Sequence, residues 1–254
     1  MKVPPRELEL AAVAASQQAA ELIRPVIGSG AALRTKSSPT DVVTATDLRA
    51  EQLIRRQLEQ SVPGSSFVGE EYPEHEGTAG VAWVIDPIDG TVNFLYDLPV
   101  VAVSIAAEVD GIVVAGAVCD VLRRETFSAS LGHGSRRDDD TISTSDVEDL
   151  AAALVATGYS YDADKRAEQA AVVSRVLPAA RDIRSMGSAA LQLCWVGCGR
   201  LDAYYERDLK RWDIAAGALI AGEAGAVVES PSRANNDLTL TASPAIFDSL
   251  RSLL

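Results

Sequence analysis

The sequence predicts a mixed α+β protein. Its first half begins with two helices and continues as an antiparallel sheet, and its second half has α/β character. Helical spacing of apolar residues covers about 7–27 and 44–60, an Asp-Gly turn joins two apolar strands, and strands alternate with helices from Asp149 onward. The sequence shows neither internal repeats nor a linker, so we expect halves 1–145 and 146–254 to share one compact body, with the functional site in the crevice between them.

Composition limits the function classes. At 254 residues and 47% apolar content, the chain is long enough to bury a substantial core. A net charge of −13 argues against a nucleic-acid partner, because nucleic-acid binding needs a basic face. The same charge should repel a phosphorylated substrate, and bound divalent cations would offset that repulsion locally.

Cysteine usage and the N-terminus predict a cytoplasmic protein. Three scattered cysteines form no disulfide framework, which fits a reducing compartment. The N-terminus lacks the order of a signal peptide, and polar residues at 16–18 and 21 interrupt any membrane span. We therefore expect neither a membrane nor a nucleic acid among the partners.

The two predicted helices open the chain. The first, at about 7–27, is expected to close at Pro25 and Gly28, and the second covers about 44–60. The polar segment KSSPTDVVTATD at 36–47 lies between them and contains Pro39. We interpret it as a loop or hairpin that returns toward the site.

A buried strand follows at Val81–Ile85, a short apolar run rich in β-branched residues. Pro87 keeps Asp86 extended and denies the sheet a backbone donor, so the strand is expected to end at Asp86.

The turn after this strand has the composition of a metal site beside a phosphate. Asp86 and Asp89 can converge on one point, where two carboxylates repel each other unless cations such as Mg²⁺ or Mn²⁺ neutralise them. Gly90 permits a backbone conformation closed to bulkier residues, and Thr91 is predicted to cap a helix whose N–H groups cradle a phosphate. Taken alone, the string is equally compatible with an acidic surface turn.

An antiparallel meander follows the turn. Runs 100–108 and 112–118 flank Asp110-Gly111, a strong hairpin signal, and 125–129 supplies a third strand. The charged segment 132–140 is interpreted as a solvated turn. The second half is predicted to contain a strand at 152–157, a helix at 165–179, a strand at 182–185, a helix at 188–196, a strand at 201–205 and a helix at 212–224.

Four ordered segments now carry a family resemblance that runs nearly end to end. They are KSSPTDVVTATD at 36–47, GEE at 69–71, WVIDPIDGTVNF at 83–94, and RWDIAAGALIAGEAGA at 211–226. The chain resembles the Mg²⁺-dependent, lithium-sensitive inositol monophosphatases of the larger sugar phosphatase superfamily. This resemblance implies a layered α-β-α-β-α sandwich, two or three Mg²⁺ ions (with Mn²⁺ as a substitute) and a homodimer.

The resemblance also implies a ligand set. Glu70, Asp86 and the carbonyl of Ile88 would hold a first metal, and Asp86, Asp89 and Asp213 a second. Two cations held side by side by these ligands would bind the attacking and leaving oxygens of an in-line displacement at phosphorus.

Other residues of the family pattern would handle the water and the phosphate. Glu70 and the Thr91 hydroxyl would orient a water and take its proton, and Asp47 would hold Thr91. Backbone N–H groups of Gly90 and Thr91 would grip the phosphate. Lys36 would lie near the metal-bound water.

The substrate is expected to be a small phosphorylated polyol. Glu206 stands seven residues before Asp213, where the family binds a substrate hydroxyl, and the family's inositol contacts fall on Gly187, Ser188 and Ala189. Val92 and Asn93 replace the lysine and glutamate that often follow the motif in nucleotide-specific relatives.

The sequence therefore predicts Mg²⁺-dependent hydrolysis of a phosphate monoester, with myo-inositol 1-phosphate as the leading substrate. Fructose 1,6-bisphosphate and histidinol phosphate remain alternatives, as does a non-catalytic module that binds metal or inositol phosphate. The family pattern is altered at Val92, at Tyr96-Asp97 and at Asp138-Asp139, none of which is a predicted ligand.

Overall fold

The first half begins with two helices that pack against each other. The computed structural model describes residues 3–29, 34–35, 42–230 and 237–254. Helix α1 spans Pro5–Ile23 and continues as a 3₁₀ turn at Arg24–Val26, so the regular helix ends earlier than the predicted 27. Pro25 explains the early end, because it has no N–H for a helical hydrogen bond.

Helix α2 spans Ala45–Ser61, in agreement with the prediction, and begins with a capping box formed by Thr44 and Asp47. The short strands β1 (Arg34–Thr35) and β2 (Val42–Val43) pair antiparallel just before it. The predicted loop or hairpin at 36–47 lies between and after these strands, and its residues 36–41 are outside the described residues.

Among the described residues, strands from the first half form a seven-stranded sheet in the order β3-β4-β5-β6-β7-β8-β9. Their bounds are β3 Ser66–Gly69, β4 Val81–Asp89, β5 Ala102–Val109, β6 Ile112–Asp120, β7 Glu125–Ser130, β8 Ser135–Arg137 and β9 Asp140–Thr141. Only β3 and β4 pair in parallel; the later neighbours run antiparallel. Asp110 and Gly111 both have positive φ, which confirms the predicted two-residue hairpin.

Two expectations for this sheet were wrong. Strand β4 does not end at Asp86 but continues to Asp89, because pairing with β5 resumes at Asp89 and Ala102 after a register shift. The segment 132–140, expected to be a solvated turn, contains β8 and the start of β9, with a tight turn at Asp138. The register shift lets pairing resume beyond Pro87. The charged residues of 135–141 suit their place in β8 and β9, at the edge of the sheet.

In the second half, the described residues form a mixed five-stranded sheet in the order β11-β10-β12-β14-β13. Strand β10 pairs in parallel with β11 and β12, as expected of an α/β arrangement, whereas β14 pairs antiparallel with β12 and β13. The bounds are β10 Leu154–Thr157, α4 Ala163–Val176, β11 Asp182–Arg184, α5 Ala189–Gly197, β12 Ala203–Arg207, α6 Arg211–Glu223, β13 Val227–Glu229, β14 Leu238–Ala242 and α7 Phe247–Arg251. A 3₁₀ turn at Leu150–Ala152 precedes β10.

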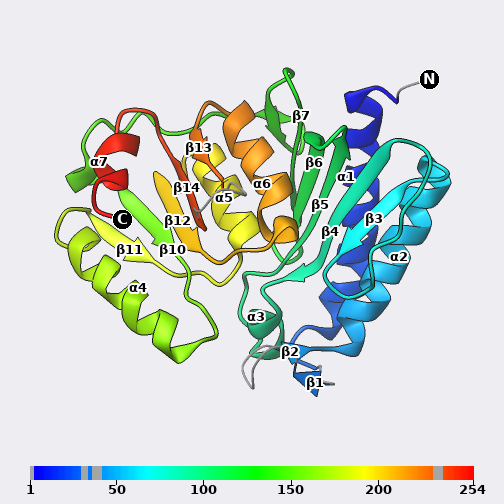
Figure 1. Ribbon diagram of the computed structural model, residues 1–254, viewed down its shortest axis with the longest axis horizontal. Helices are drawn as coiled ribbons and strands as arrows, with labels where there is room; N and C mark the ends of the chain where they lie inside the picture. The colour runs from blue at the N-terminus through cyan, green and yellow to red at the C-terminus, as the bar shows by residue number, and fades with distance from the viewer. Residues whose placement is uncertain (1–2, 30–33, 36–41, 231–236) are drawn as a thin grey trace.

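The elements stack in alternating layers (Figure 1). Helices α1 and α2 cover one face of the seven-stranded sheet, α5 and α6 lie between the two sheets, and α4 and α7 cover the outer side of the five-stranded sheet. Each junction has its own apolar core, centred on Trp83, on Tyr204 with Leu191, and on Leu240 with Leu250. This arrangement is the layered sandwich that the sequence predicted.

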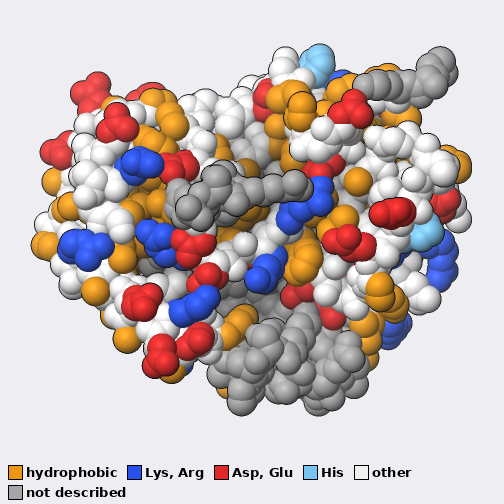
Figure 2. Space-filling view, viewed as in Figure 1, with side chains coloured by type: hydrophobic (Ala, Val, Ile, Leu, Met, Phe, Trp, Pro, Cys, Tyr) orange, Lys and Arg blue, Asp and Glu red, His pale blue; other side chains and the backbone are white. Residues whose placement is uncertain are grey.

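Charged side chains of both signs are interspersed on the face shown in Figure 2, so the net negative charge is not gathered there into a region of one sign. No helix in the described ranges is long and apolar enough to cross a membrane.

Candidate active site

The centre of the site is the turn from β4 into α3 (Thr91–Leu95), at the end of the seven-stranded sheet. The Ile88 N–H donates to Asp86 Oδ1 over 3.0 Å, which tightens the turn. Gly90 has φ +95, and a Cβ there would lie 2.8 Å from the carbonyl oxygen of Val100. Only glycine fits this position without strain. Gly90 is therefore the N-cap of α3 and Thr91 its first residue, which corrects the prediction that Thr91 caps the helix.

Asp47 connects helix α2 to this turn. The Thr91 hydroxyl lies 3.1 Å from the Ile88 carbonyl oxygen and 3.5 Å from Asp47 Oδ1, a long hydrogen bond. The other oxygen of the fully buried Asp47 carboxylate accepts hydrogen bonds from the Thr44 N–H, at 2.9 Å, and from the Thr44 hydroxyl. The Asp47 side chain thus has both the contact with Thr91 that the family pattern implies and a role in starting the helix.

Glu70 approaches Asp86 from the parallel neighbour strand. Its N–H donates to the Ile85 carbonyl over 3.2 Å, directly after β3 ends at Gly69. Burial is the main cause that raises the pKa of Asp86 well above its usual value, and the negative charge of Glu70 is the next.

Asp89 is held by the beginning of helix α5. Its Oδ2 accepts hydrogen bonds from the Ser188 hydroxyl at 2.6 Å and the Ala190 N–H at 2.7 Å, and its Oδ1 accepts from the Ala189 N–H at 3.3 Å. Burial raises the pKa of Asp89 to about 6, although these three donors act in the opposite direction. Residues of the predicted substrate-binding segment 187–189 therefore donate hydrogen bonds to Asp89, a predicted metal ligand.

Asp213 completes the acidic cluster from the first turn of α6. Its Oδ2 accepts the Lys210 N–H over 2.6 Å. Burial is the main cause that raises its pKa well above the usual value, and the negative charge of Asp89 is the next. Asp213 thus serves as a helix cap and also contributes to the shared electrostatic field.

The donor set of this cluster fits a hard divalent cation. Glu70, Asp86, Asp89 and Asp213 offer only oxygen atoms as ligands. The pKa of each of the three aspartates is raised, mainly by burial and further by the negative charges of neighbouring carboxylates. Within the described ranges, no three His, Cys, Asp or Glu side chains are already arranged around one metal position. Several of these oxygens instead accept hydrogen bonds from neighbouring protein groups.

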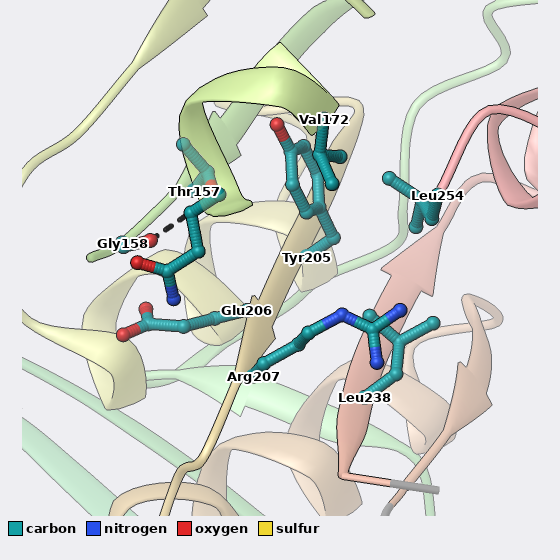
Figure 3. Close-up of a pocket in the computed structure, with 9 residues that line it drawn as sticks. Thr157, Gly158, Val172, Tyr205, Glu206, Arg207, Leu238 and Leu254 are labelled. Atoms are coloured by element: carbon teal, nitrogen blue, oxygen red, sulfur yellow. Dashed lines mark hydrogen bonds between the residues drawn. The ribbon is translucent and has the colours of Figure 1, made fainter. Parts of the chain in front are cut away.

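Glu206 lies at the end of β12, beside the acidic cluster. The Tyr204 hydroxyl donates to its Oε2 over 2.5 Å. A Cβ on Gly158 would lie only 1.9 Å from the same oxygen, so the glutamate occupies space left by that glycine. Burial is the main cause that raises the pKa of Glu206 to about 7. Figure 3 shows Glu206 and Gly158 side by side in the wall of a small cavity of about 10 Å³.

Two residues of this region were not predicted from the sequence. Asn93 donates from Nδ2 to the carbonyl oxygens of Val100 and Met186, each at 2.8 Å, and so ties the β4–α3 turn to the segment before α5. Its place in the NF pair of the motif was a signal, but its partners lie far along the chain. Gly158 carried no signal at all. The predicted Lys36 is outside the described residues.

Comparison with known proteins identifies the family of the chain. The model of the family described as "Inositol monophosphatase family" matches residues 5–249. A Mycobacterium leprae inositol-1-monophosphatase is 44% identical over 100% of this chain and 96% of its own length. The inositol-1-monophosphatase SuhB of Mycobacterium tuberculosis strain H37Rv is 47% identical over 89% of this chain and 82% of its own.

Solved structures give the same answer. The structure of Mycobacterium tuberculosis SuhB has a TM-score of 0.85 and 42% sequence identity, with 99% of this chain and 96% of that chain covered. The family model, the sequence identities and the shared fold show that the chain belongs to the inositol monophosphatase family.

Proposed function

We propose that this protein hydrolyses a phosphate monoester of a small polyol in a Mg²⁺-dependent reaction, with myo-inositol 1-phosphate as the leading substrate. The observation that carries the proposal is the joining of Glu70, Asp86, Asp89 and Asp213 in one electrostatic cluster around the turn whose Ile88 carbonyl oxygen lies 3.1 Å from the Thr91 hydroxyl. The names of the mycobacterial relatives support inositol monophosphate as the substrate.

The proposed metal ligands follow the family pattern. Glu70, Asp86 and the Ile88 carbonyl would hold one Mg²⁺, and Asp86, Asp89 and Asp213 a second. A third ion, and Mn²⁺ as a substitute, belong to the same proposal. When bound, these cations supply an acidified water and positive charge at the attacking and leaving oxygens.

The chain's own groups orient the reacting partners. Glu70 and the Thr91 hydroxyl position the attacking water, whose proton would pass to the Glu70 carboxylate, and Asp47 fixes Thr91 through the contact at 3.5 Å. The N–H groups of Gly90 and Thr91 donate to the phosphate oxygens. Lys36 is assigned to the same water by resemblance alone.

Recognition of the polyol is assigned to Glu206 and to the backbone of 187–189. The Ser188 hydroxyl and the Ala189 N–H already donate to Asp89, so these two groups hold that carboxylate, and the backbone of Gly187 and the carbonyl of Ala189 are assigned to the substrate. Fructose 1,6-bisphosphate and histidinol phosphate stay as alternatives because the catalytic groups do not distinguish them. A homodimer, a cytoplasmic location and inhibition by lithium are further expectations from the family.

The test is phosphate release from inositol 1-phosphate, fructose 1,6-bisphosphate, histidinol phosphate and phosphoadenosine phosphate, each with and without Mg²⁺. We expect fast Mg²⁺-dependent release from inositol 1-phosphate. Preference for another ester would overturn the assignment of Glu206. Metal binding without turnover of any ester would instead favour a non-catalytic binding module.

A further inference from the structure

Helix α2 presents three charged side chains toward the site at four-residue spacing. Asp47, Glu51 and Arg55 are one turn apart and so share a helix face. Asp47 and Glu51 are fully buried, and the Arg55 side chain is only 18% exposed. Asp47 contacts Thr91, whereas Glu51 and Arg55 contact the segment 69–73, which carries Glu70.

The Glu51 carboxylate binds the backbone next to Glu70. Its Oε2 accepts the Glu71 N–H over 2.8 Å, and its Oε1 accepts the Arg55 Nε–H, also over 2.8 Å. A Cβ on Gly69 would lie 2.0 Å from Glu51 Oε1, so the carboxylate packs directly against the residue before Glu70. The backbone on both sides of Glu70 is therefore in contact with one buried side chain.

Arg55 binds the far side of the same segment. Its guanidinium donates to the carbonyl oxygens of Tyr72 at 3.1 Å and Pro73 at 3.2 Å. It also lies over the rings of Phe67 and Tyr72, at 5.5 Å and 5.6 Å from their centroids. The planar guanidinium uses several of its donors at once, which a lysine ammonium cannot reproduce with the same geometry.

An apolar pair would fill this space with less desolvation cost, because burying an ion pair is expensive. It would leave the Glu71 N–H and the Tyr72 and Pro73 carbonyls without these partners. The Glu51–Arg55 ion pair thus satisfies backbone N–H and carbonyl groups of the segment 69–73, which carries the proposed metal ligand Glu70.

We propose that Glu51 and Arg55 act as positioning residues that fix the Glu70 carboxylate relative to Asp86 and Thr91. This inference rests on the proposed function, because it assigns Glu70 to metal binding and water orientation. Helix α2 would then position both groups that orient the attacking water. Asp47 positions Thr91, and Glu51 and Arg55 position Glu70.

The main test is metal affinity of Glu51→Gln, measured by calorimetric titration of the protein with Mn²⁺ alone. A glutamine oxygen can accept from only one side, so its amide N–H₂ would oppose either Arg55 or the Glu71 N–H. We expect Mn²⁺ binding to weaken by about 10- to 100-fold, the usual effect of removing a partner that orients a metal ligand.

Glu9→Gln is the matched control. Glu9 is also a buried glutamate and lies in α1. Its two carboxylate oxygens accept hydrogen bonds from the hydroxyls of Ser128 at 2.9 Å and Ser130 at 2.8 Å, both in β7 and not in the segment around Glu70. It should lose stability and keep its Mn²⁺ affinity. Equal weakening in both variants would show a general structural effect and overturn the inference.

A second measurement follows the segment itself. Amide hydrogen exchange over 69–72 should accelerate in Glu51→Gln relative to the rest of the sheet, and remain as in wild type in Glu9→Gln. If Glu51→Gln does not fold, Arg55→Lys and Arg55→Gln replace it, with Mn²⁺ affinity expected in the order wild type, Lys, Gln. A folded Glu51→Gln, or a folded Arg55→Gln in its place, with wild-type affinity and exchange would refute the positioning role.

These readouts separate the two proposals. If wild type binds Mn²⁺ and hydrolyses no phosphate ester, the proposed function fails while the affinity and exchange comparisons still decide the role of Glu51. If wild type is active but the variants match it in affinity and exchange, only the positioning inference fails.

Discussion

The Ser188 hydroxyl donates to Asp89 Oδ2 over 2.6 Å and thereby joins the end of one sheet to the start of a helix in the other half of the chain. The Ala190 N–H donates to the same oxygen at 2.7 Å. A carboxylate at the end of β4 is thus oriented by residues about a hundred positions later. The geometry of the acidic cluster depends on how α5 packs between the two sheets.

Asp89→Asn should abolish most activity and leave the fold intact, because it removes ligand charge with little change of shape. We expect kcat/KM to fall by about 100-fold or more. Asp202→Asn is the control, since Asp202 also accepts two short hydrogen bonds, from Ser145 Oγ and the Leu154 N–H, away from the cluster. Near-wild-type activity in a folded Asp89→Asn would contradict the assignment of Asp89 as a ligand in a two-metal site.

The metal-free protein should show a pH-dependent stability difference between wild type and Asp89→Asn. Burial raises the pKa of Asp89 from 3.8 to about 6, so the folded chain binds this proton more tightly than the unfolded chain. Stability from this group is therefore present below pH 3.8 and is lost as the pH rises to about 6. The free energy of unfolding of the asparagine variant should therefore rise relative to that of wild type across this pH range, by at most about 3 kcal/mol. Urea unfolding in chelator, from pH 4 to about 7, measures the difference; a constant difference would contradict the shift.

Gly158→Ala should weaken substrate binding without touching the metal ligands. The new Cβ would displace the Glu206 carboxylate, so KM should rise by about 10- to 100-fold, as for loss of a hydrogen bond to a charged group. Glu206→Gln should show a similar rise. Gly222→Ala is the control, because a Cβ there meets only Val228 at an ordinary 3.7 Å. An unchanged KM with unchanged Mg²⁺ affinity in Gly158→Ala would remove Glu206 from substrate recognition.

Asp47→Asn should lower kcat by about tenfold or more through loss of Thr91 orientation. It should also lower stability by about 1 kcal/mol, because Asp47 is part of the α2 capping box. Thr44→Ala is the comparison, since it removes the cap hydroxyl, which also donates to Asp47 Oδ2, and keeps the Asp47 carboxylate and its contact with Thr91. Thermal melts and steady-state kinetics on both variants are the measurement. The same kcat loss in Thr44→Ala would assign the effect to the helix cap alone.

Local sequence signals predicted the elements whose cause is local. The Asp110-Gly111 turn determined the β5–β6 hairpin, and the apolar spacing of 44–60 determined α2 almost to its ends. The end of β4 was predicted wrongly because pairing with Ala102 of β5 resumes beyond Pro87. Strands β13 and β14 and helix α7 were not predicted; β14 is placed by its pairing with β12, which sequence periodicity does not report.

The sequence by itself determined the fold class, the family and the residue types predicted for the site. Motif spacing and apolar periodicity depend on residues close together in the sequence, so they can be identified without the tertiary structure. Only the tertiary structure showed that Ser188 orients Asp89, that Gly158 makes room for Glu206, and that Glu51 and Arg55 bind the segment around Glu70. These contacts join residues far apart in sequence, and their partners are chosen by the packing of α2 and α5 against the sheets.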